Sequence, residues 1–332
     1  MNPLVLRLNA ATSPVSPDER KILATVEAEI VEVEQPEACG CLEQVDAVMI
    51  VSAYLRTPLI KRMTRCRIIS RMGTGTDKID VAQATAQGIM VANVPDFATG
   101  EVADHTLALL LSAARKLKVF ERYMRSGHHP FDAVAVRRLS AQTLGVIGFG
   151  HIGRAVAERA LAFGLRVLVC DPCVTAEQAA AAGVTAVGKD AILAEADYLC
   201  LLCPLLPSTR GMLAMPEFRK MKRDAVLINT GRGELVNERE LAEALKTGVI
   251  AYAGLDVFGE VNVFDLDGFP CDHPLFGLDN VQLTPHVAAV SSESLTEAHV
   301  RAAQAVADVF SGRTPPHLLN PTVIKNRHNE HE

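Results

Sequence analysis

The glycine pattern at residues 148–153 constrains the fold of this chain more than any other feature. These residues read GFGHIG, which has the spacing GxGxxG. They follow the apolar run 143–147, which we expect to be a buried strand, and they open an alanine-rich run that we expect to be a helix. Asp171 lies 18 residues after Gly153, at the end of the next apolar run. Together these features predict a dinucleotide-binding βαβ unit.

Each position of this pattern has a physical reason. Gly148 permits the tight turn, Gly150 lets the backbone approach a pyrophosphate, and Gly153 lets the helix pack close to the strand. His151 and Ile152 stand at the expected start of the helix, where free backbone N–H groups bind phosphate. We expect these five residues to bind a cofactor, with His151 acting through its backbone. The alternative is an ordinary βαβ unit that happens to contain a glycine turn.

Asp171 indicates which dinucleotide is bound. Its carboxylate is expected to accept hydrogen bonds from the hydroxyls of the adenosine ribose, and its charge would repel a 2′-phosphate. Neither Arg166 before the strand nor Pro172 after the acid resembles a phosphate clamp. The sequence therefore favours NAD over NADP.

Two series of short apolar runs alternate with helical patterns along the chain. Expected strands in the first series lie at 4–10, 28–34, 45–53, 66–73 and 88–95, with helices at 17–27 and 81–88. Expected strands in the second series lie at 143–148, 165–171, 196–203, 224–230, 250–258 and 281–286, with helices at 153–164, 216–222 and 238–248. This alternation predicts an α/β protein with two doubly wound, Rossmann-like parallel sheets, and the glycine motif belongs to the second.

Two longer helices complete the pattern. We expect one continuous helix over 101–125, capped near Thr99, and a second over 292–311. The apolar positions of 101–125 are too dense for one face, which predicts burial on two sides, including against another subunit.

Composition limits the possible functions. A chain of 332 residues with 49% hydrophobic residues is long enough for two domains. A net charge of −6 without concentrated Lys and Arg argues against nucleic acid as a partner. The first ten residues do not resemble a signal peptide, and no apolar run approaches the roughly 20 residues that span a bilayer. We expect a soluble, cytoplasmic protein that binds neither nucleic acid nor membranes.

The eight cysteines are expected to be free thiols. The pairs Cys170/Cys173 and Cys200/Cys203 have CxxC spacing, which leaves a four-thiolate zinc site as an alternative. Cys170 and Cys200 stand in apolar runs, where cysteine acts as a small hydrophobic residue. We therefore expect no metal at these pairs.

Three segments carry reactive side chains just after expected strands. The segment 229–234 reads NTGRGE, 254–260 reads GLDVFGE, and 283–289 reads LTPHVAA. Arg232 lies between two glycines, so a ligand can approach it closely, and a guanidinium binds a carboxylate with two parallel hydrogen bonds. Arg232 alone could equally be structural, and His286 alone could be a core histidine.

These segments resemble those of the D-isomer-specific 2-hydroxyacid dehydrogenases. The resemblance runs over nearly the whole chain and includes GTGTDKID, NVPDFATGEVADHTLALLL, GFGHIG, CDP, NTGRGELV, GLDVF and TPH. The family includes formate, glycerate, phosphoglycerate and phosphite dehydrogenases and the C-terminal-binding-protein corepressors. The resemblance implies hydride transfer between NAD and C2 of a small 2-hydroxy or 2-keto acid.

The resemblance also implies roles for individual residues. Arg232 matches the substrate-binding arginine, His286 the acid/base, and Glu260 most nearly the carboxylate that pairs with that histidine. Further positions are assigned to the cofactor: Thr99, Cys203, Thr230, Gly231, Asp256 and His286. The loop that holds the substrate carboxylate through backbone amides is matched by Met72, Gly73, Thr74 and Gly75.

One position departs from the family pattern. The family glutamate usually stands three residues after the Phe of DVF; that place is Val261 here, and Glu260 is one residue earlier. The segment that follows is longer than usual, and a one-residue shift could be absorbed by the loop. The alternative is that Glu260 is a solvated loop acid.

The same segment contains four residues of types that bind metals. Their spacing does not match a calcium-binding loop, so we expect no metal there. These residues are Asp265, Asp267, Asp272 and His273.

The family fold implies the domain organisation. Residues 1–97, completed by 291–332, would form the substrate domain, and 98–290 the NAD-binding domain, with the active site in the cleft between them. The resemblance also implies a homodimer.

The loop 51–56 carries no arginine at the place usual for phosphoglycerate enzymes, although Arg56 could reach into the substrate site. We therefore expect an unphosphorylated substrate such as glyoxylate or hydroxypyruvate. The alternatives are an NAD(H)-sensing corepressor-like protein and a phosphite or phosphoglycerate dehydrogenase.

Overall fold

The chain folds into two compact units that are interleaved along the sequence. The computed structural model describes residues 2–128, 134–265, 268–269 and 271–324. Unit 1 consists of Met1–Phe97 and Ser291–Glu332, and unit 2 consists of Ala98–Val290. Unit 1 is therefore assembled from both ends of the chain. That unit 1 binds the substrate remains a prediction.

Unit 1 contains a five-stranded parallel sheet in the order β2-β1-β3-β4-β5. Its strands are β1 (Leu4–Leu8), β2 (Glu29–Val33), β3 (Ala47–Ile50), β4 (Ile68–Arg71) and β5 (Met90–Ala92). Its helices are α1 (Pro17–Ala24), α2 (Thr57–Arg62), α3 (Val81–Ala86) and α11 (Ser292–Phe310), with the 3₁₀ turns η1 (Pro36–Ala38) and η2 (Leu42–Gln44). All five strands fall inside the predicted apolar runs.

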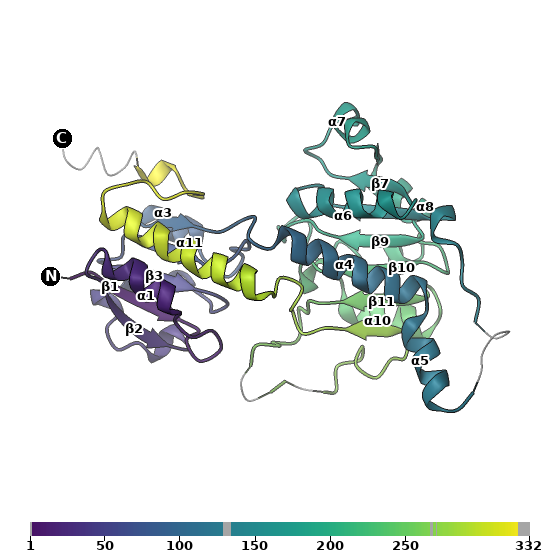
Figure 1. Ribbon diagram of the computed structural model, residues 1–332, viewed down its shortest axis with the longest axis horizontal. Helices are drawn as coiled ribbons and strands as arrows, with labels where there is room; N and C mark the ends of the chain where they lie inside the picture. Colours follow the sequence, from purple (N-terminus) through teal and green to yellow (C-terminus); the bar gives the residue numbers. More distant parts are fainter. Residues whose placement is uncertain (1, 129–133, 266–267, 270, 325–332) are drawn as a thin grey trace. The chain divides into compact units, whose positions relative to one another are not determined.

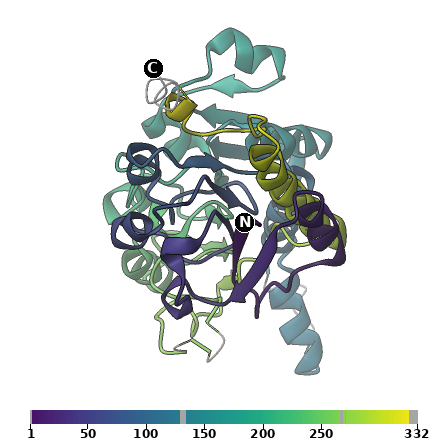
Figure 2. The same cartoon turned by 90° about the vertical axis from the view of Figure 1, so that its left-hand side faces the viewer.

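Helix α11 covers one face of this sheet (Figures 1 and 2). Ala302 and Val306 of α11 are buried in one cluster with Met49 and Ile68 of the strands. The small alanine side chains let the helix come close, and the hydroxyl of Ser70 donates a 2.9 Å hydrogen bond to the carbonyl of Ala302. The last helix of the chain is thus part of the core formed by its first strands.

A buried ion cluster joins three elements of unit 1. The Arg7 Nε of β1 donates to Glu19 Oε1 of α1 at 2.9 Å, and His299 Nδ1 of α11 lies 2.9 Å from Glu19 Oε2. Arg7 and Glu19 are at most 1% exposed. Burial alone would raise the pKa of Glu19, but hydrogen bonds from His299, Ser16 and Arg7 outweigh it and lower the pKa to about 2.

Unit 2 contains a seven-stranded parallel sheet in the order β12-β11-β10-β9-β6-β7-β8. Its strands are β6 (Thr143–Ile147), β7 (Arg166–Cys170), β8 (Thr185–Ala186), β9 (Tyr198–Leu201), β10 (Val226–Asn229), β11 (Tyr252–Leu255) and β12 (Val281–Leu283). Its helices are α4 (Thr99–Ala114), α5 (Leu117–Arg125), α6 (His151–Ala162), α7 (Ala176–Ala181), α8 (Lys189–Glu195), α9 (Met215–Phe218) and α10 (Glu238–Lys246), with η3 (Leu139–Ala141) and η4 (Gly233–Leu235). The predicted class, two Rossmann-like parallel sheets, is confirmed.

Helices cover both faces of this sheet, as the unbroken apolar runs of its strands require. Val226 and Ile228 of β10 pack in a cluster with α4 and α6, whereas Leu227 packs on the opposite face with α8 and α10. This alternation follows from the two-residue period of a strand. Among the described helices of the chain, none is long and apolar enough to cross a membrane.

The prediction of one helix over 101–125 is wrong. Helix α4 ends at Ala114, and α5 begins at Leu117 after Lys116, which adopts a left-handed φ of 56°. A residue in that conformation ends a helix because the backbone hydrogen bonds cannot continue through it. Thr99 is also not the cap: Ala98 occupies the cap position, and no side-chain hydrogen bond is made there.

Candidate active site

The carboxyl ends of β6, β7 and β9 meet at Gly148. Its amide donates to the carbonyl of Cys170 at 3.0 Å, and its φ is 94°. A side chain at this position would place Cβ only 2.5 Å from the amide nitrogen of Cys203. Because the strand order reverses between β6 and β9, this point is where doubly wound sheets bind ligands.

The other two glycines of the motif define the start of α6. Gly150 is the cap residue, and open space surrounds the position that its Cβ would occupy. A Cβ on Gly153 would lie 2.2 Å from the carbonyl oxygen of Gly148, so only glycine lets the helix pack this close. His151 is exposed and Ile152 half-buried at the first turn. The amides of that turn are placed as a phosphate site requires.

Asp171 is positioned against this turn. Its Oδ2 accepts a 2.7 Å hydrogen bond from the amide of Phe149, and its Oδ1 accepts one of 2.8 Å from the amide of Cys173. These bonds fix the carboxylate just beyond β7, beside the glycine turn. Each oxygen keeps lone-pair capacity for a ribose hydroxyl.

Three of the cysteines near this point, Cys170, Cys200 and Cys203, are buried or half-buried. Burial raises the pKa of Cys200 to about 12 and that of Cys203 to about 11, and it also raises the pKa of Cys170. Cys200 is fully buried in β9, as the sequence predicted.

A second group of side chains follows the neighbouring strands β10, β11 and β12. Asn229 ends β10, and its amide group shapes the next loop: Nδ2 donates to the carbonyl of Arg232 at 2.8 Å, and Oδ1 accepts from the amide of Gly231 at 3.1 Å. A Cβ on Gly233 would lie 2.1 Å from the amide nitrogen of Gly259, so the loop after β10 lies directly against the segment after β11.

Arg232 and Thr230 are held within this loop. Arg232 is half-buried, and its Nη1 donates to the carbonyl of Gly231 at 2.7 Å. Thr230 is buried, and its Oγ1 lies 2.7 Å from Oγ1 of Thr106 in α4. The loop is therefore fixed to the sheet and to α4 at once.

Asp256 holds the loop that carries His286. Asp256 is fully buried; its Oδ1 accepts from the Thr284 hydroxyl at 2.6 Å and from the amide of Val287 at 3.0 Å, and its Oδ2 accepts from the amide of Ala288 at 2.9 Å. The amide of His286 donates to the carbonyl of Asp256 at 2.7 Å. His286 has a left-handed φ of 57°, a strained conformation that persists only where neighbouring contacts impose it.

In unit 1, the loop after β4 is also fixed by its own backbone. The amide of Met72 donates to the carbonyl of Ile50 at 2.8 Å, and that of Gly73 to the carbonyl of Arg71 at 3.0 Å. Within the described part of the chain, the amides of Thr74 and Gly75 donate to no protein acceptor. Of the four residues predicted for the substrate carboxylate, these two offer amides that a ligand could use.

The comparisons with known proteins agree with this geometry. Residues 107–288 match the family model described as the NAD-binding domain of the D-isomer specific 2-hydroxyacid dehydrogenases. A glyoxylate reductase of Korarchaeum cryptofilum is 36% identical over 89% of this chain and 87% of its own. The chain belongs to this family. It is an NAD-dependent oxidoreductase that interconverts hydroxy acids and keto acids.

Two further relatives show how far the likeness extends. A D-3-phosphoglycerate dehydrogenase of Mycobacterium leprae is 34% identical over 92% of this dehydrogenase, which spans only 53% of that protein. The crystal structure of the Aquifex aeolicus D-lactate dehydrogenase complexed with NAD and lactic acid matches with a TM-score of 0.86. It is 28% identical and covers 97% of this chain and 98% of its own.

The residues of this dehydrogenase fit the dinucleotide. The glycine turn leaves room for a pyrophosphate at Gly150, and Asp171 faces that turn. Within the described chain, Thr99 Oγ1 is buried and makes no hydrogen bond. A buried hydroxyl without a partner is costly, which supports the prediction that Thr99 contacts the cofactor.

The sequence reasoning missed two residues of this site. Arg154 lies in the first turn of α6, and its guanidinium carbon is 4.5 Å from the centre of the Phe149 ring, which places a positive charge beside the phosphate site. His105 of α4 lies 2.9 Å from the hydroxyl of Thr284 and supports the His286 loop. Arg154 could have been found from its place directly after the motif; His105 required the tertiary structure.

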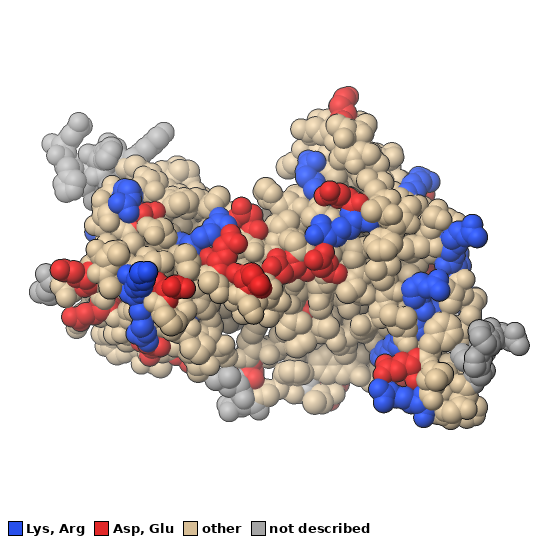
Figure 3. Space-filling model, viewed as in Figure 1, with Lys and Arg blue, Asp and Glu red and all other residues tan. Residues whose placement is uncertain are grey.

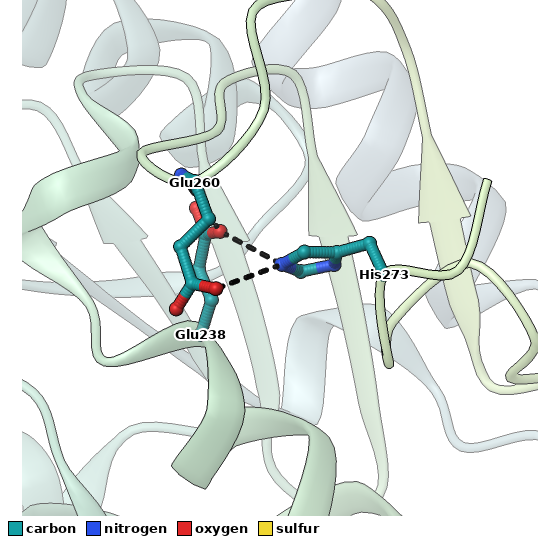
Figure 4. A group of neighbouring side chains, drawn as sticks. All are labelled: Glu238, Glu260 and His273. Carbon is teal, nitrogen blue, oxygen red and sulfur yellow. Dashed lines mark hydrogen bonds and ion pairs between the residues drawn. The ribbon is translucent and has the colours of Figure 1, made fainter. Parts of the chain in front are cut away.

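Glu260 does not contact His286 in the described part of the chain. Its Oε2 lies 2.7 Å from Nη2 of Arg239 and 4.0 Å from Nε2 of His273 (Figure 4). The family's usual position is taken by Val261, which is 9% exposed. The catalytic pairing of Glu260 with His286 therefore stays a prediction, and it needs a rearrangement of this segment.

Glu238, Glu260 and His273 each place one potential metal-ligand atom within 4.8 Å of the other two (Figure 4). Nε2 of His273 lies 3.2 Å from Oε2 of Glu238, and it is one of the buried polar atoms in the described chain that make no hydrogen bond.

Proposed function

We propose that this dehydrogenase interconverts a small, unphosphorylated D-2-hydroxy acid and its 2-keto acid, with glyoxylate or hydroxypyruvate as the keto substrate. The observation that carries the proposal is the set of loops after β10, β11 and β12, which bring Arg232, Asp256 and His286 to the carboxyl edge of one sheet. Arg232, His286 and the glycine turn at 148–153 occur in one chain, and the names of the relatives given above refer to small acids. Both facts support this proposal.

Each residue has a definite task in this reaction. When bound, NAD supplies or accepts the hydride at its nicotinamide ring. The His286 imidazole takes the hydroxyl proton during oxidation and returns it during reduction. The guanidinium of Arg232 binds the substrate carboxylate and stabilises charge that develops on the carbonyl oxygen. Asp256 keeps the His286 loop in its strained conformation, and the amides of Thr74 and Gly75 are available to the carboxylate.

A phosphorylated substrate is the second candidate, because two cations flank the loop after β3. The guanidinium carbon of Arg56 and the Nζ of Lys78 each lie 4.8 Å from the centre of the Tyr54 ring, which is 51% exposed. These cations could bind a phosphate. Arg56 also donates to the carbonyl of Asp77, and Lys78 to that of Ser52, so both already have partners. We therefore place this candidate second.

The test is a panel of keto acids reduced with NADH: glyoxylate, hydroxypyruvate, pyruvate and 3-phosphohydroxypyruvate. We expect turnover of a small unphosphorylated acid and a loss of about 10²- to 10⁴-fold in kcat for His286→Ala, because the general acid is removed. His128→Ala, which changes an exposed histidine after α5, is the matched control and keeps wild-type activity. Preference for the phosphorylated acid would establish the second candidate, and an unchanged His286→Ala would contradict the assigned role.

We also propose that the protein is a homodimer formed through unit 2 and that it is cytoplasmic. The family resemblance and the exposed apolar residues of α5 support the proposed homodimer. On the face drawn in Figure 3, both units carry acidic and basic side chains.

A further inference from the structure

An aromatic side chain packs against the proposed acid/base histidine. The centres of the Phe264 and His286 rings lie 5.2 Å apart, and the ring planes are inclined by 49°. Phe264 is half-buried and belongs to the segment 259–265, which follows β11 and replaces the usual family pattern.

Glu238 fixes the beginning of this segment. Glu238 is the first residue of α10 and is 4% exposed; its Oε1 accepts from the amide of Gly259 at 2.6 Å, and its Oε2 accepts from the amide of Glu260 at 3.4 Å. The Nε2 of His273, which follows the segment, lies 3.2 Å from the same Oε2 (Figure 4). One buried carboxylate thus contacts the chain on both sides of the segment.

A local turn then directs Phe264. The amide of Phe264 donates to Oδ1 of Asn262 at 3.3 Å, and the amide of Asp265 donates to the carbonyl of Asn262 at 3.2 Å. Val261, at the start of the turn, is buried. The segment is therefore fixed at Glu238, packed at Val261 and turned at Asn262, so the contact of Phe264 with His286 has a structural cause.

We propose that Phe264 is a positioning residue for His286: its ring restricts the rotation of the imidazole and holds it in the orientation needed for proton transfer. This proposal rests on the proposed function of His286. An imidazole on a short loop can rotate about two side-chain bonds, and a packed aromatic partner removes alternative rotamers. Proton transfer depends steeply on the position of the donor, so the loss of this contact lowers kcat more than it weakens binding.

The experiment compares Phe264→Ala and Phe264→Tyr with the matched control Phe269→Ala. Phe269 lies in the same stretch of chain but packs against Phe276, with ring centres 5.9 Å apart. With the best keto acid of the panel, we expect kcat to fall about 3- to 10-fold in Phe264→Ala, the size of a lost aromatic contact. The KM for NADH should stay within about twofold in all variants, while Phe264→Tyr and the control keep wild-type kcat.

A spectroscopic measurement separates positioning from a general structural role. The proton resonance of the His286 imidazole, assigned by its disappearance in His286→Gln, should move in Phe264→Ala because the ring current of Phe264 is lost. It should stay in place in the control.

An unchanged kcat in Phe264→Ala, or a lower kcat without movement of the His286 resonance, would overturn the inference alone. A wild-type protein that reduces none of the keto acids would overturn the proposed function, and the inference with it.

Discussion

At the scale of residues, we propose that Asp171 determines which dinucleotide the enzyme uses. Its carboxylate is fixed beside the glycine turn by the amides of Phe149 and Cys173. We expect Asp171→Asn to lower the ratio of kcat/KM for NADH to that for NADPH by about tenfold or more, because the charge that repels a 2′-phosphate is removed. Steady-state kinetics with both cofactors measure this ratio.

The control for this prediction is Asp190→Asn. Asp190 is an exposed acid of α8 whose carboxylate lies 2.8 Å from Lys220. The Asp190→Asn variant should leave the ratio of kcat/KM for NADH to that for NADPH unchanged. If Asp171→Asn behaves like this control, then Asp171 does not select the cofactor.

Single residues also show which contacts could be predicted from the sequence and which could not. Gly148, Gly153 and Asp171 stand in the turn and the strand end where the sequence placed them, because short-range pattern determines a βαβ turn. The partners of Asp256 could not be predicted, since its carboxylate binds amides 31 and 32 positions later. Nor could the contacts of Glu260, because they depend on the path of a segment that the family pattern does not describe.

At the scale of elements, the cluster of Arg7, Glu19 and His299 joins β1, α1 and α11. The pKa of Glu19, about 2, lies below its ordinary 4.5, so its ionised form stabilises the fold above about pH 4.5, and this stabilisation is lost as the pH falls toward 2. We expect Glu19→Gln to lower the free energy of unfolding by about 3 kcal/mol at pH 7. The difference from wild type should shrink between pH 4.5 and 2.

Urea unfolding at pH 7 and pH 3 measures this dependence. Glu32→Gln changes an exposed partner of Arg20 and should alter stability by less than about 1 kcal/mol at either pH. A pH-independent difference for Glu19→Gln would show that the charge of Glu19 does not stabilise the fold.

The elements themselves were predictable where the hydrophobic pattern was strong. Every strand of unit 1 lies within a predicted run. Strands β3 and β5 are wholly apolar and buried, whereas the edge strand β2 was recognisable from its β-branched residues. The two-residue strand β8 was missed because two residues carry no periodicity. The break between α4 and α5 was also missed, since Lys116 is an ordinary helix former and its left-handed conformation comes from the tertiary structure.

At the scale of the whole molecule, α5 has no buried residue in the single chain. Leu117 is 55% exposed and Met124 71% exposed, and such apolar side chains are common at subunit contacts. We expect Leu117→Glu combined with Met124→Glu to convert a dimer into monomers in sedimentation velocity, because charge would be buried without a partner.

Leu295→Glu is the control for this prediction, because Leu295 is a 44% exposed leucine in unit 1. A dimer through unit 2 should tolerate it. A wild-type monomer at micromolar concentration would contradict the proposed dimer directly.

The interleaved path of the chain has a consequence for how the protein is made. The apolar face formed by Met49 and Ile68 is completed by Ala302 and Val306 of α11, which a ribosome adds more than two hundred residues later. Unit 2 is a continuous segment and can fold while the first sheet still lacks its covering helix. During that interval the first sheet exposes an apolar face, and transiently exposed apolar surface favours aggregation.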